Sequence, residues 1–386
     1  MKPTFLTILL FNSIFVFHSC TNEEIKNVSP GIAIEQEPLF SIDTFQTSLA
    51  NFISGIDKSY YDSIISIDLD FWNEFSGEIN DDFAKIKSER LMKMSQWSQS
   101  SFIDKSIDTS LVFYPFSGPD FLHAYYLYPN ANEYILLALE KVGNIPNWKE
   151  IGPKASIEYL ENTNNFLRDI YLRSYFITKH MQIDIREEKK ISGVLSSLYW
   201  FLSRTDHQLM NVERVTLDSQ GKLITKDKED GLDGVRFSFV KKGEKEIKRL
   251  TYFSCDISDD GFAKKNPELF IYLNNMRACN TFVKSASYLM HYGSFKNIRN
   301  VVLDKSLTIF QDDTGIPYKY VANDDWNIRC FGSYVKPIKD FEHNTSLYQN
   351  DLATRYKGAT EKLPFSLGYH WKNAFEQNQM LLIRNK

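Results

Sequence analysis

The chain has 386 residues, of which 43% are hydrophobic and 15% aromatic, so it is long enough for one large domain or two ordinary ones around a ring-rich core. Its formal net charge is −4, with acidic and basic residues interspersed, which gives no electrostatic basis for binding nucleic acid or an anionic membrane surface. The cysteines beyond Cys20 have no C-x-x-C spacing, which argues against a disulfide framework, and we expect buried free thiols at Cys255, Cys279 and Cys330.

A leader occupies residues 1–19. Lys2 precedes a largely apolar run from Phe5 to Val16, and the small residue Ser19 stands directly before Cys20. The run is shorter than the ~20 apolar residues of a membrane-spanning helix, and its parts are those of a secretory signal. It resembles a bacterial lipoprotein signal, which implies that Cys20 is lipidated and becomes the mature N-terminus. The alternative is a buried N-terminal helix with an incidental cysteine.

A lipid anchor implies a place in the cell envelope, at the outer membrane. The sequence leaves open whether the protein is on the periplasmic or the surface face of that membrane. The segment Thr21-Asn22-Glu23-Glu24 resembles the acidic tag that directs Bacteroidota lipoproteins to the outer face, and a solvated linker is an equal alternative. Residues 20–38 are polar without periodicity, which is typical of a flexible tether. The membrane, reached through the lipid, is therefore the first expected partner.

The body begins with a helical pattern from Ile42 to Phe102, where apolar residues recur at helical spacing. Ser110–Phe116 has a strand pattern and leads into turn residues, and Phe121–Tyr128 is apolar enough for a short buried helix. Tyr134–Glu140 is a continuous apolar run, typical of a strand covered on both faces. This order predicts a Rossmann-like βαβ unit with parallel strands.

The second half contains segments that alternate apolar and polar residues, which predicts an antiparallel block. Its expected strands are 212–217, 223–225, 235–239 and 249–253. Helices are expected at 157–178 and 191–204 before this block and at 267–277, 282–291 and 295–303 after it, followed by a strand at 307–310 and an aromatic, irregular C-terminal part. The sequence therefore predicts a mixed α/β fold with helices packed around two lobes, 39–205 and 206–386, that share one core or form one fused domain.

Ser117–Asp120, after the first predicted strand, and Glu140, at the end of the second, form the first candidate site. A strand that leads into a turn and a helix N-terminus can bind an anion, and an acidic residue ~20 positions further on is where dinucleotide folds bind ribose. The G-x-G-x-x-G fingerprint is absent, however, because only Gly118 is present and Pro119 lacks the N–H that would hold phosphate. We therefore expect a scaffold or pocket here, and no nucleotide cofactor.

The same segment contains the residue types of a serine hydrolase, which needs a nucleophile, a base and an orienting acid within hydrogen-bond reach. They are Ser117, His123 and Asp120. Ser117 is not in a G-x-S-x-G elbow. A histidine in the core or at its rim is the better interpretation of His123.

Three further sites contain side chains that could take part in catalysis or binding. Asp312 and Asp313 could share a proton or bind a metal, but Asp-Asp-Thr-Gly is also ordinary turn sequence. Lys284, followed by serine and tyrosine, has the pattern of an activated lysine. The default interpretation of Lys284 is an exposed lysine on a helix. Asp256 ends a predicted strand without an evident partner. The histidines lack H-x-x-x-H and H-E-x-x-H spacing, so we expect no metal site.

Three stretches together carry a resemblance: Tyr114–Leu122 (YPFSGPDFL), Lys284–Met290 (KSASYLM) and Phe310–Tyr318 (FQDDTGIPY). They are similar to a family of uncharacterised bacterial proteins, many of them envelope lipoproteins of Bacteroidota, over most of the chain after about Trp72. The resemblance implies an envelope lipoprotein with a single fused architecture. It implies no activity, cofactor or site residue.

Two functions remain open. The first is a non-catalytic binding or assembly role at the envelope, with a small ligand or an envelope protein as partner. The alternative is a hydrolase-type enzyme that uses polar residues at strand ends, since ligands of α/β sheets bind outside the carboxyl ends of the strands. The candidate pocket residues are Ser117, Asp120, Glu140, Asp256, Lys284, Asp312 and Asp313.

Overall fold

The structure is a computed structural model that describes residues 41–62, 64–101, 110–185, 191–227, 230–372 and 376–385. Residues Ser41–Lys386 form one compact unit. The expected signal peptide, the lipidation site Cys20 and the tether to residue 38 lie outside the described residues. Within the described ranges, every helix is too short or too polar to cross a membrane.

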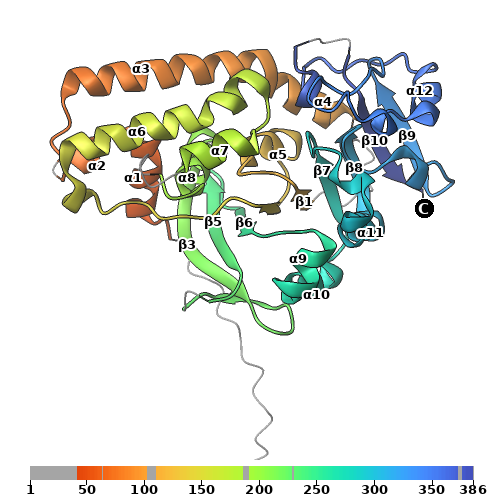
Figure 1. The fold of residues 1–386 in the computed structure, drawn as a ribbon. Coiled ribbons are helices and arrows are strands. Elements are labelled where there is room, and N and C mark those ends of the chain that lie inside the picture. Colours follow the sequence, from red (N-terminus) through yellow and green to blue (C-terminus); the bar gives the residue numbers. More distant parts are fainter. Residues whose placement is uncertain are drawn as a thin grey trace, which may run out of the picture. The chain divides into compact units, whose positions relative to one another are not determined.

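Ten strands of the described residues form one mixed sheet in the order β4-β3-β5-β6-β2-β1-β7-β8-β10-β9 (Figure 1). The central strands β6, β2, β1, β7 and β8 are parallel, and the strands on either side of them are antiparallel. Their bounds are β1 Leu111–Pro115, β2 Glu133–Ala138, β3 His207–Leu217, β4 Leu223–Thr225, β5 Asp233–Lys241, β6 Ile247–Ser254, β7 Cys279–Val283, β8 Ser306–Asp312, β9 Trp326–Phe331 and β10 Gln379–Arg384. The prediction of a mixed α/β fold with an antiparallel block is confirmed.

The predicted βαβ unit consists of β1, the helix α5 (Phe121–Leu127) and β2. The two strands pair in parallel, with Leu111 opposite Glu133. Helix α5 begins after Asp120 because that side chain accepts a hydrogen bond from the N–H of His123. All residues of β1 are buried, as in a strand covered on both faces. The parallel pairing confirms the βαβ unit, and its narrower likeness to a Rossmann unit stays a prediction.

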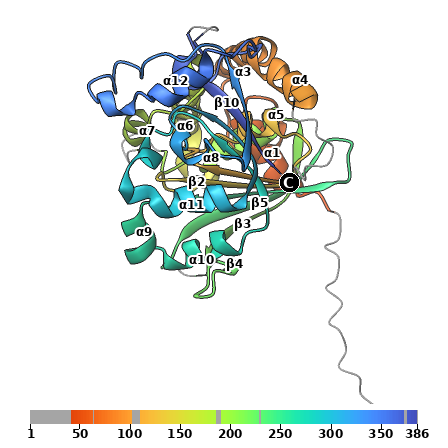
Figure 2. The same cartoon turned by 90° about the vertical axis from the view of Figure 1, so that its right-hand side faces the viewer.

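Helices cover both faces of the sheet. Successive strand residues point to opposite faces, so apolar side chains on both faces are buried against helices. Val112 and Tyr114 belong to a core cluster with the helices from α1 to α8, whereas Leu111 and Phe113 belong to a second cluster with α9 to α12 (Figures 1 and 2). The helices are α1 Thr44–Ile53, α2 Ser59–Asp62, α3 Leu69–Ile86, α4 Met92–Ser101, α6 Trp148–Arg173, α7 Thr178–Asp184, α8 Leu195–Arg204, α9 Asp259–Lys264, α10 Pro267–Asn275, α11 Lys296–Lys305 and α12 Asn350–Tyr356. The body is thus a three-layer arrangement of helices, sheet and helices.

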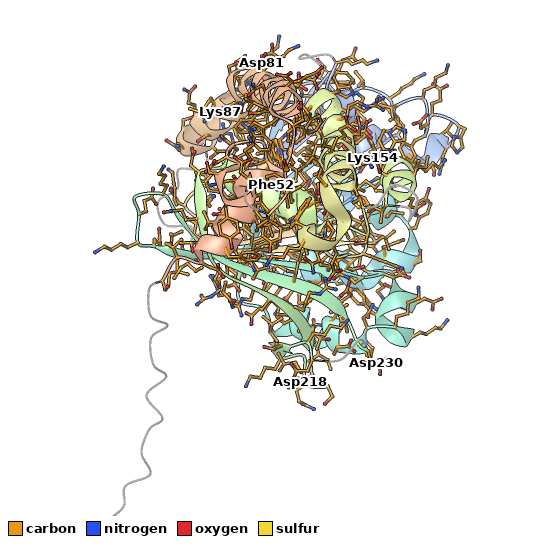
Figure 3. All side chains as sticks on the ribbon, turned by 90° about the vertical axis from the view of Figure 1, so that its left-hand side faces the viewer. Phe52, Asp81, Lys87, Lys154, Asp218 and Asp230 are labelled. Atoms are coloured by element: carbon orange, nitrogen blue, oxygen red, sulfur yellow. The ribbon has the colours of Figure 1, made fainter. Side chains whose placement is uncertain are left out.

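The first core cluster is rich in aromatic rings, as the composition predicts. The ring of Phe52 lies 4.5 Å from that of Tyr61, 5.7 Å from that of Trp72 and 5.1 Å from that of Trp148. Figure 3 shows Phe52 inside the molecule, while Lys154 extends outward from α6. Aromatic packing therefore joins α1, α2, α3 and α6.

Two predictions for the later part of the chain are wrong. The segment 282–291, predicted as a helix, completes β7 and continues as a loop with short 3-10 turns. A short, fully buried strand has no alternating pattern, so periodicity alone cannot separate it from a buried helix. The C-terminal part, predicted as irregular, contributes β9 and β10 to the sheet. Lys284 consequently follows a central strand and does not lie on a helix.

The cysteines behave as the sequence predicts. Those that the structure describes lie in the core cluster on the α9 to α12 side and are buried and free: Cys255, Cys279 and Cys330. Burial raises the pKa of the Cys279 thiol to about 11, so it stays protonated at neutral pH. These thiols act as small apolar core groups.

Candidate functional site

A cavity of about 650 Å³ lies at the carboxyl ends of the parallel strands, and we call it the strand-end cavity. Loops that follow four of these strands line it: Phe116–Gly118 after β1, Leu139–Glu140 after β2, Cys255–Ile257 after β6 and Lys284–Ser287 after β7. The remaining wall includes Tyr175–Lys179, Phe341 and Tyr369. Parallel strands end on the same edge of a sheet, so loops distant in sequence meet there.

A buried ion pair lies at the wall of the strand-end cavity. The Lys284 Nζ lies 2.9 Å from Asp120 Oδ2, and the two side chains are 2% and 0% exposed. Lys284 also donates a hydrogen bond to the main-chain carbonyl of Ser174, just after α6. The pair therefore joins the end of β7, the start of α5 and the end of α6.

The Asp120 carboxylate is surrounded by donors. The Tyr114 hydroxyl donates to it at 3.2 Å, and the His123 Nδ1 lies 2.9 Å from its Oδ1. Burial acts to raise the pKa of Asp120, but His123 and Lys284 outweigh it and hold the pKa at about 2. Burial also lowers the pKa of His123 to about 4. At neutral pH Asp120 is therefore a carboxylate beside a neutral imidazole. Burial lowers the pKa of Lys284, and the contact with Asp120 acts against this lowering.

The loop after β7 has a strained backbone. Ser285, Ser287 and Tyr288 adopt φ values of 52°, 52° and 58°, in the left-handed region that non-glycine residues rarely enter. Phe116, on the neighbouring strand end, has a φ of 59°. Such conformations cost on the order of 1–3 kcal/mol each and cluster at functional sites. The surrounding structure must therefore hold this part of the cavity wall in place.

Two aspartates behind the wall provide that support. The Asp312 carboxylate accepts hydrogen bonds from the N–H of Ser285 at 2.8 Å and from the N–H of Thr314 at 3.1 Å. The neighbouring Asp313 accepts one from the Tyr288 hydroxyl at 2.8 Å. Burial and the adjacent Asp312 raise the pKa of Asp313 to about 7.

Glu140 and Asp256 lie on the wall at the ends of adjacent strands, but their surroundings differ. The Asp256 carboxylate accepts hydrogen bonds from the N–H and hydroxyl of Ser258 and pairs with Lys265 at 2.9 Å. Burial acts to raise the pKa of Asp256, but these contacts outweigh it and lower the pKa. Glu140 is 7% exposed, and burial raises its pKa. Asp256 is thus engaged within the protein, whereas Glu140 is a buried acid beside open space.

The structure brings the candidate pocket residues to one edge of the sheet. Ser117, Glu140, Asp256 and Lys284 line the strand-end cavity. Asp120, Asp312 and Asp313 lie behind its wall and hold Lys284 and the loop 285–288. The Ser117 hydroxyl donates to the main-chain carbonyls of Gly118 at 2.6 Å and Leu137 at 3.2 Å, so it supports the turn.

The sequence did not identify several wall residues. The rings of Tyr175 and Tyr369 lie 4.9 Å apart, and that of Phe341 lies 5.5 Å from Tyr369. Tyr369 also bonds to the Ser287 hydroxyl at 3.0 Å. No local motif marks these rings, because they reach the cavity from the end of α6 and from the irregular C-terminal part.

Comparison with family models, with curated proteins and with solved structures finds no match for this chain. The family resemblance of its three motifs therefore stays a prediction, and the interpretation of the site rests on its geometry. The described residues contain no group of three or more histidine, cysteine, aspartate or glutamate side chains placed to hold a metal ion.

The buried ion pair yields a prediction about stability. Lys284→Met leaves the Asp120 charge buried without its lysine, which should lower the free energy of unfolding by about 3–5 kcal/mol. The double variant Asp120→Asn with Lys284→Met removes both charges and should recover part of that loss. Urea denaturation at neutral pH measures both. If the loss in the double variant equals the sum of the losses in Asp120→Asn and in Lys284→Met, the two residues are not coupled.

The Asp313 carboxyl yields a prediction about pH. Because its folded-state pKa is raised from 3.8 to about 7, its contribution to stability is full below the unfolded pKa and is lost as the pH rises through the folded value. Asp313→Asn should therefore flatten this part of the stability profile and make the protein more stable than wild type above about pH 7. Urea denaturation across that range is the measurement, with the exposed Asp340→Asn as control. An unchanged profile in the Asp313 variant would refute the assignment.

Proposed function

We propose that this chain is a lipid-anchored protein of the bacterial cell envelope whose folded body binds a small organic molecule in the strand-end cavity. The observation that carries the proposal is the convergence of loops after β1, β2, β6 and β7 on one cavity. Ligands of open α/β sheets bind at this edge. The leader before Cys20 and the resemblance to envelope lipoproteins support the anchor.

The character of the cavity supports binding of a small molecule. Its volume of about 650 Å³ lies within the range of small-molecule sites. Its wall combines aromatic and aliphatic side chains with a few polar groups, among them Glu140 and Ser285. The Asp120–Lys284 pair and the hydrogen bond from Ser285 to Asp312 hold the wall before a ligand arrives. A wall that is already ordered lowers the entropy cost of binding.

The contacts favour binding over a hydrolase function. A serine hydrolase needs a nucleophile within reach of a base. The Ser117 hydroxyl bonds main-chain carbonyls and the Ser287 hydroxyl bonds Tyr369, while the Ser285 hydroxyl has no hydrogen-bond partner among the residues that the structure describes. Among the described residues, therefore, none of these three serine hydroxyls of the wall bonds a histidine or a carboxylate. The imidazole of His123 is fully buried against Asp120.

Blocking the cavity tests its role. Ile177, at the start of α7, lines the cavity, whereas Ile183 on the same helix does not and is 48% exposed. A metabolite library screened by thermal shift should contain a compound that stabilises the protein, by about 2.7 kcal/mol at a concentration 100 times its Kd. Ile177→Trp should abolish this shift by filling the space, and Ile183→Trp should keep it. A shift that survives in Ile177→Trp places the ligand elsewhere and defeats the proposal.

The anchor is tested separately at Cys20. Cys20→Ser removes the thiol that would carry the lipid, so the protein should lose its acyl groups and leave the membrane fraction. Mass spectrometry of the N-terminal peptide and fractionation of cells measure these effects. A variant that stays with the membrane as firmly as the wild type would show that the lipid on Cys20 is not the anchor.

A further inference from the structure

The charges around the strand-end cavity are not balanced. The Lys284 ammonium is neutralised by Asp120 at 2.9 Å, and the Asp256 carboxylate by Lys265 at 2.9 Å. Glu140, by contrast, forms no ion pair with any residue that the structure describes. The wall thus contains one buried carboxyl group whose counter-charge the described protein does not supply.

Burial makes this carboxyl group costly. Glu140 is 7% exposed, and an isolated ionised carboxylate in such a place is strongly unfavourable. Burial is the largest effect and raises the pKa of Glu140, although hydrogen bonds from the main-chain N–H groups of Glu140 and Leu139 act to lower it. Such a group either keeps its proton or meets a cation. In this protein the open space beside Glu140 is the place from which a cation can come.

The rest of the wall suits a cation attached to an apolar body. The rings of Tyr175, Phe341 and Tyr369 form a continuous wall of the same cavity, with neighbouring ring centres 4.9 Å and 5.5 Å apart. Aromatic faces attract cations and pack against apolar groups. Of the two lysines in the described wall, Lys284 is already bound to Asp120 and Lys179 is exposed, so these residues offer an anionic ligand no buried cation that is free to pair with it.

We propose that the ligand of the strand-end cavity is an organic amine in its ammonium form, whose N–H groups donate to the Glu140 carboxylate while its apolar part lies against the rings of Tyr175, Phe341 and Tyr369. This inference rests on the proposed function, because it names the class of molecule that the cavity binds. Binding to the protonated acid is an exchange: the carboxyl group releases its proton to water, and the ammonium takes its place beside the carboxylate.

Other titratable groups near Glu140 must be separated from it in a test. The Tyr252 hydroxyl donates to the Glu140 main-chain carbonyl. The cavity also contains Cys255, whose pKa burial raises, and Asp256, whose pKa is lowered. Lys179, Lys284 and Asp340 complete the charged groups of the wall. A pH effect belongs to Glu140 only if it disappears when that residue is replaced.

The probes are phenethylamine, its neutral analogue phenethyl alcohol and the anion phenylacetate, measured with the full protein by calorimetry. The amine should bind at least ten times more tightly than either analogue at about pH 8, and its affinity should fall by about tenfold for each pH unit below the Glu140 pKa. Glu140→Gln should lower the affinity for the amine by at least about tenfold and remove the pH dependence. Glu78→Gln, which removes an exposed charge on α3 outside the cavity, should change the affinity by less than about threefold.

Equal binding of the alcohol or the anion overturns the inference, as does amine binding that Glu140→Gln leaves intact. Failure of the amine to bind the wild-type protein also overturns it. These failures differ from failure of the proposed function. If neutral or anionic molecules bind and Ile177→Trp blocks them, the cavity is a binding site for another class of ligand. If Ile177→Trp blocks nothing, the cavity itself is not the site.

Discussion

The contact between Asp120 and Lys284 constrains the whole strand-end cavity, because neither charge can stay buried without the other. Asp120 caps α5 directly after the first central strand, and Lys284 follows the last residue of β7. The lysine also reaches the carbonyl of Ser174 at the end of α6. The pair therefore holds together a strand end, a helix start and a helix end from distant parts of the chain.

A second layer of polar contacts supports the strained loop after β7. Asp312 and Thr314, at and after the end of β8, bind the main-chain N–H groups of Ser285 and Ala286. These bonds offset the cost of left-handed backbone at residues that carry a side chain. Most buried charges at this edge thus have partners inside the protein. Glu140 is different, since it lies beside open space and forms no ion pair with any residue that the structure describes, and this difference is the basis of the proposed ligand class.

Those parts of the fold that are defined by residues adjacent in the sequence could be predicted. The turn residues Ser117–Asp120, the apolar segment of α5 and the buried run of β2 together indicate the βαβ unit, and alternating residues indicate the strands from β3 to β6. The strands β7 and β10 could not be found in this way. Both are buried among partners that are distant in sequence, so packing rather than a local pattern defines them.

The sequence by itself indicated which polar residues follow β1, β2 and β6, because Ser117, Glu140 and Asp256 each come after a local apolar run. It placed Lys284 on a helix, and only the structure shows that this lysine follows β7. The leader before Cys20 is likewise inferred from adjacent residues and stays a prediction. Only the tertiary structure decided which of these residues share a cavity and which support it from behind. The reason is strand order: β7 lies beside β1, and β6 beside β2, although each pair is separated by more than a hundred residues of chain. Hydrogen bonds between strands, not spacing along the sequence, bring the four loops to one place.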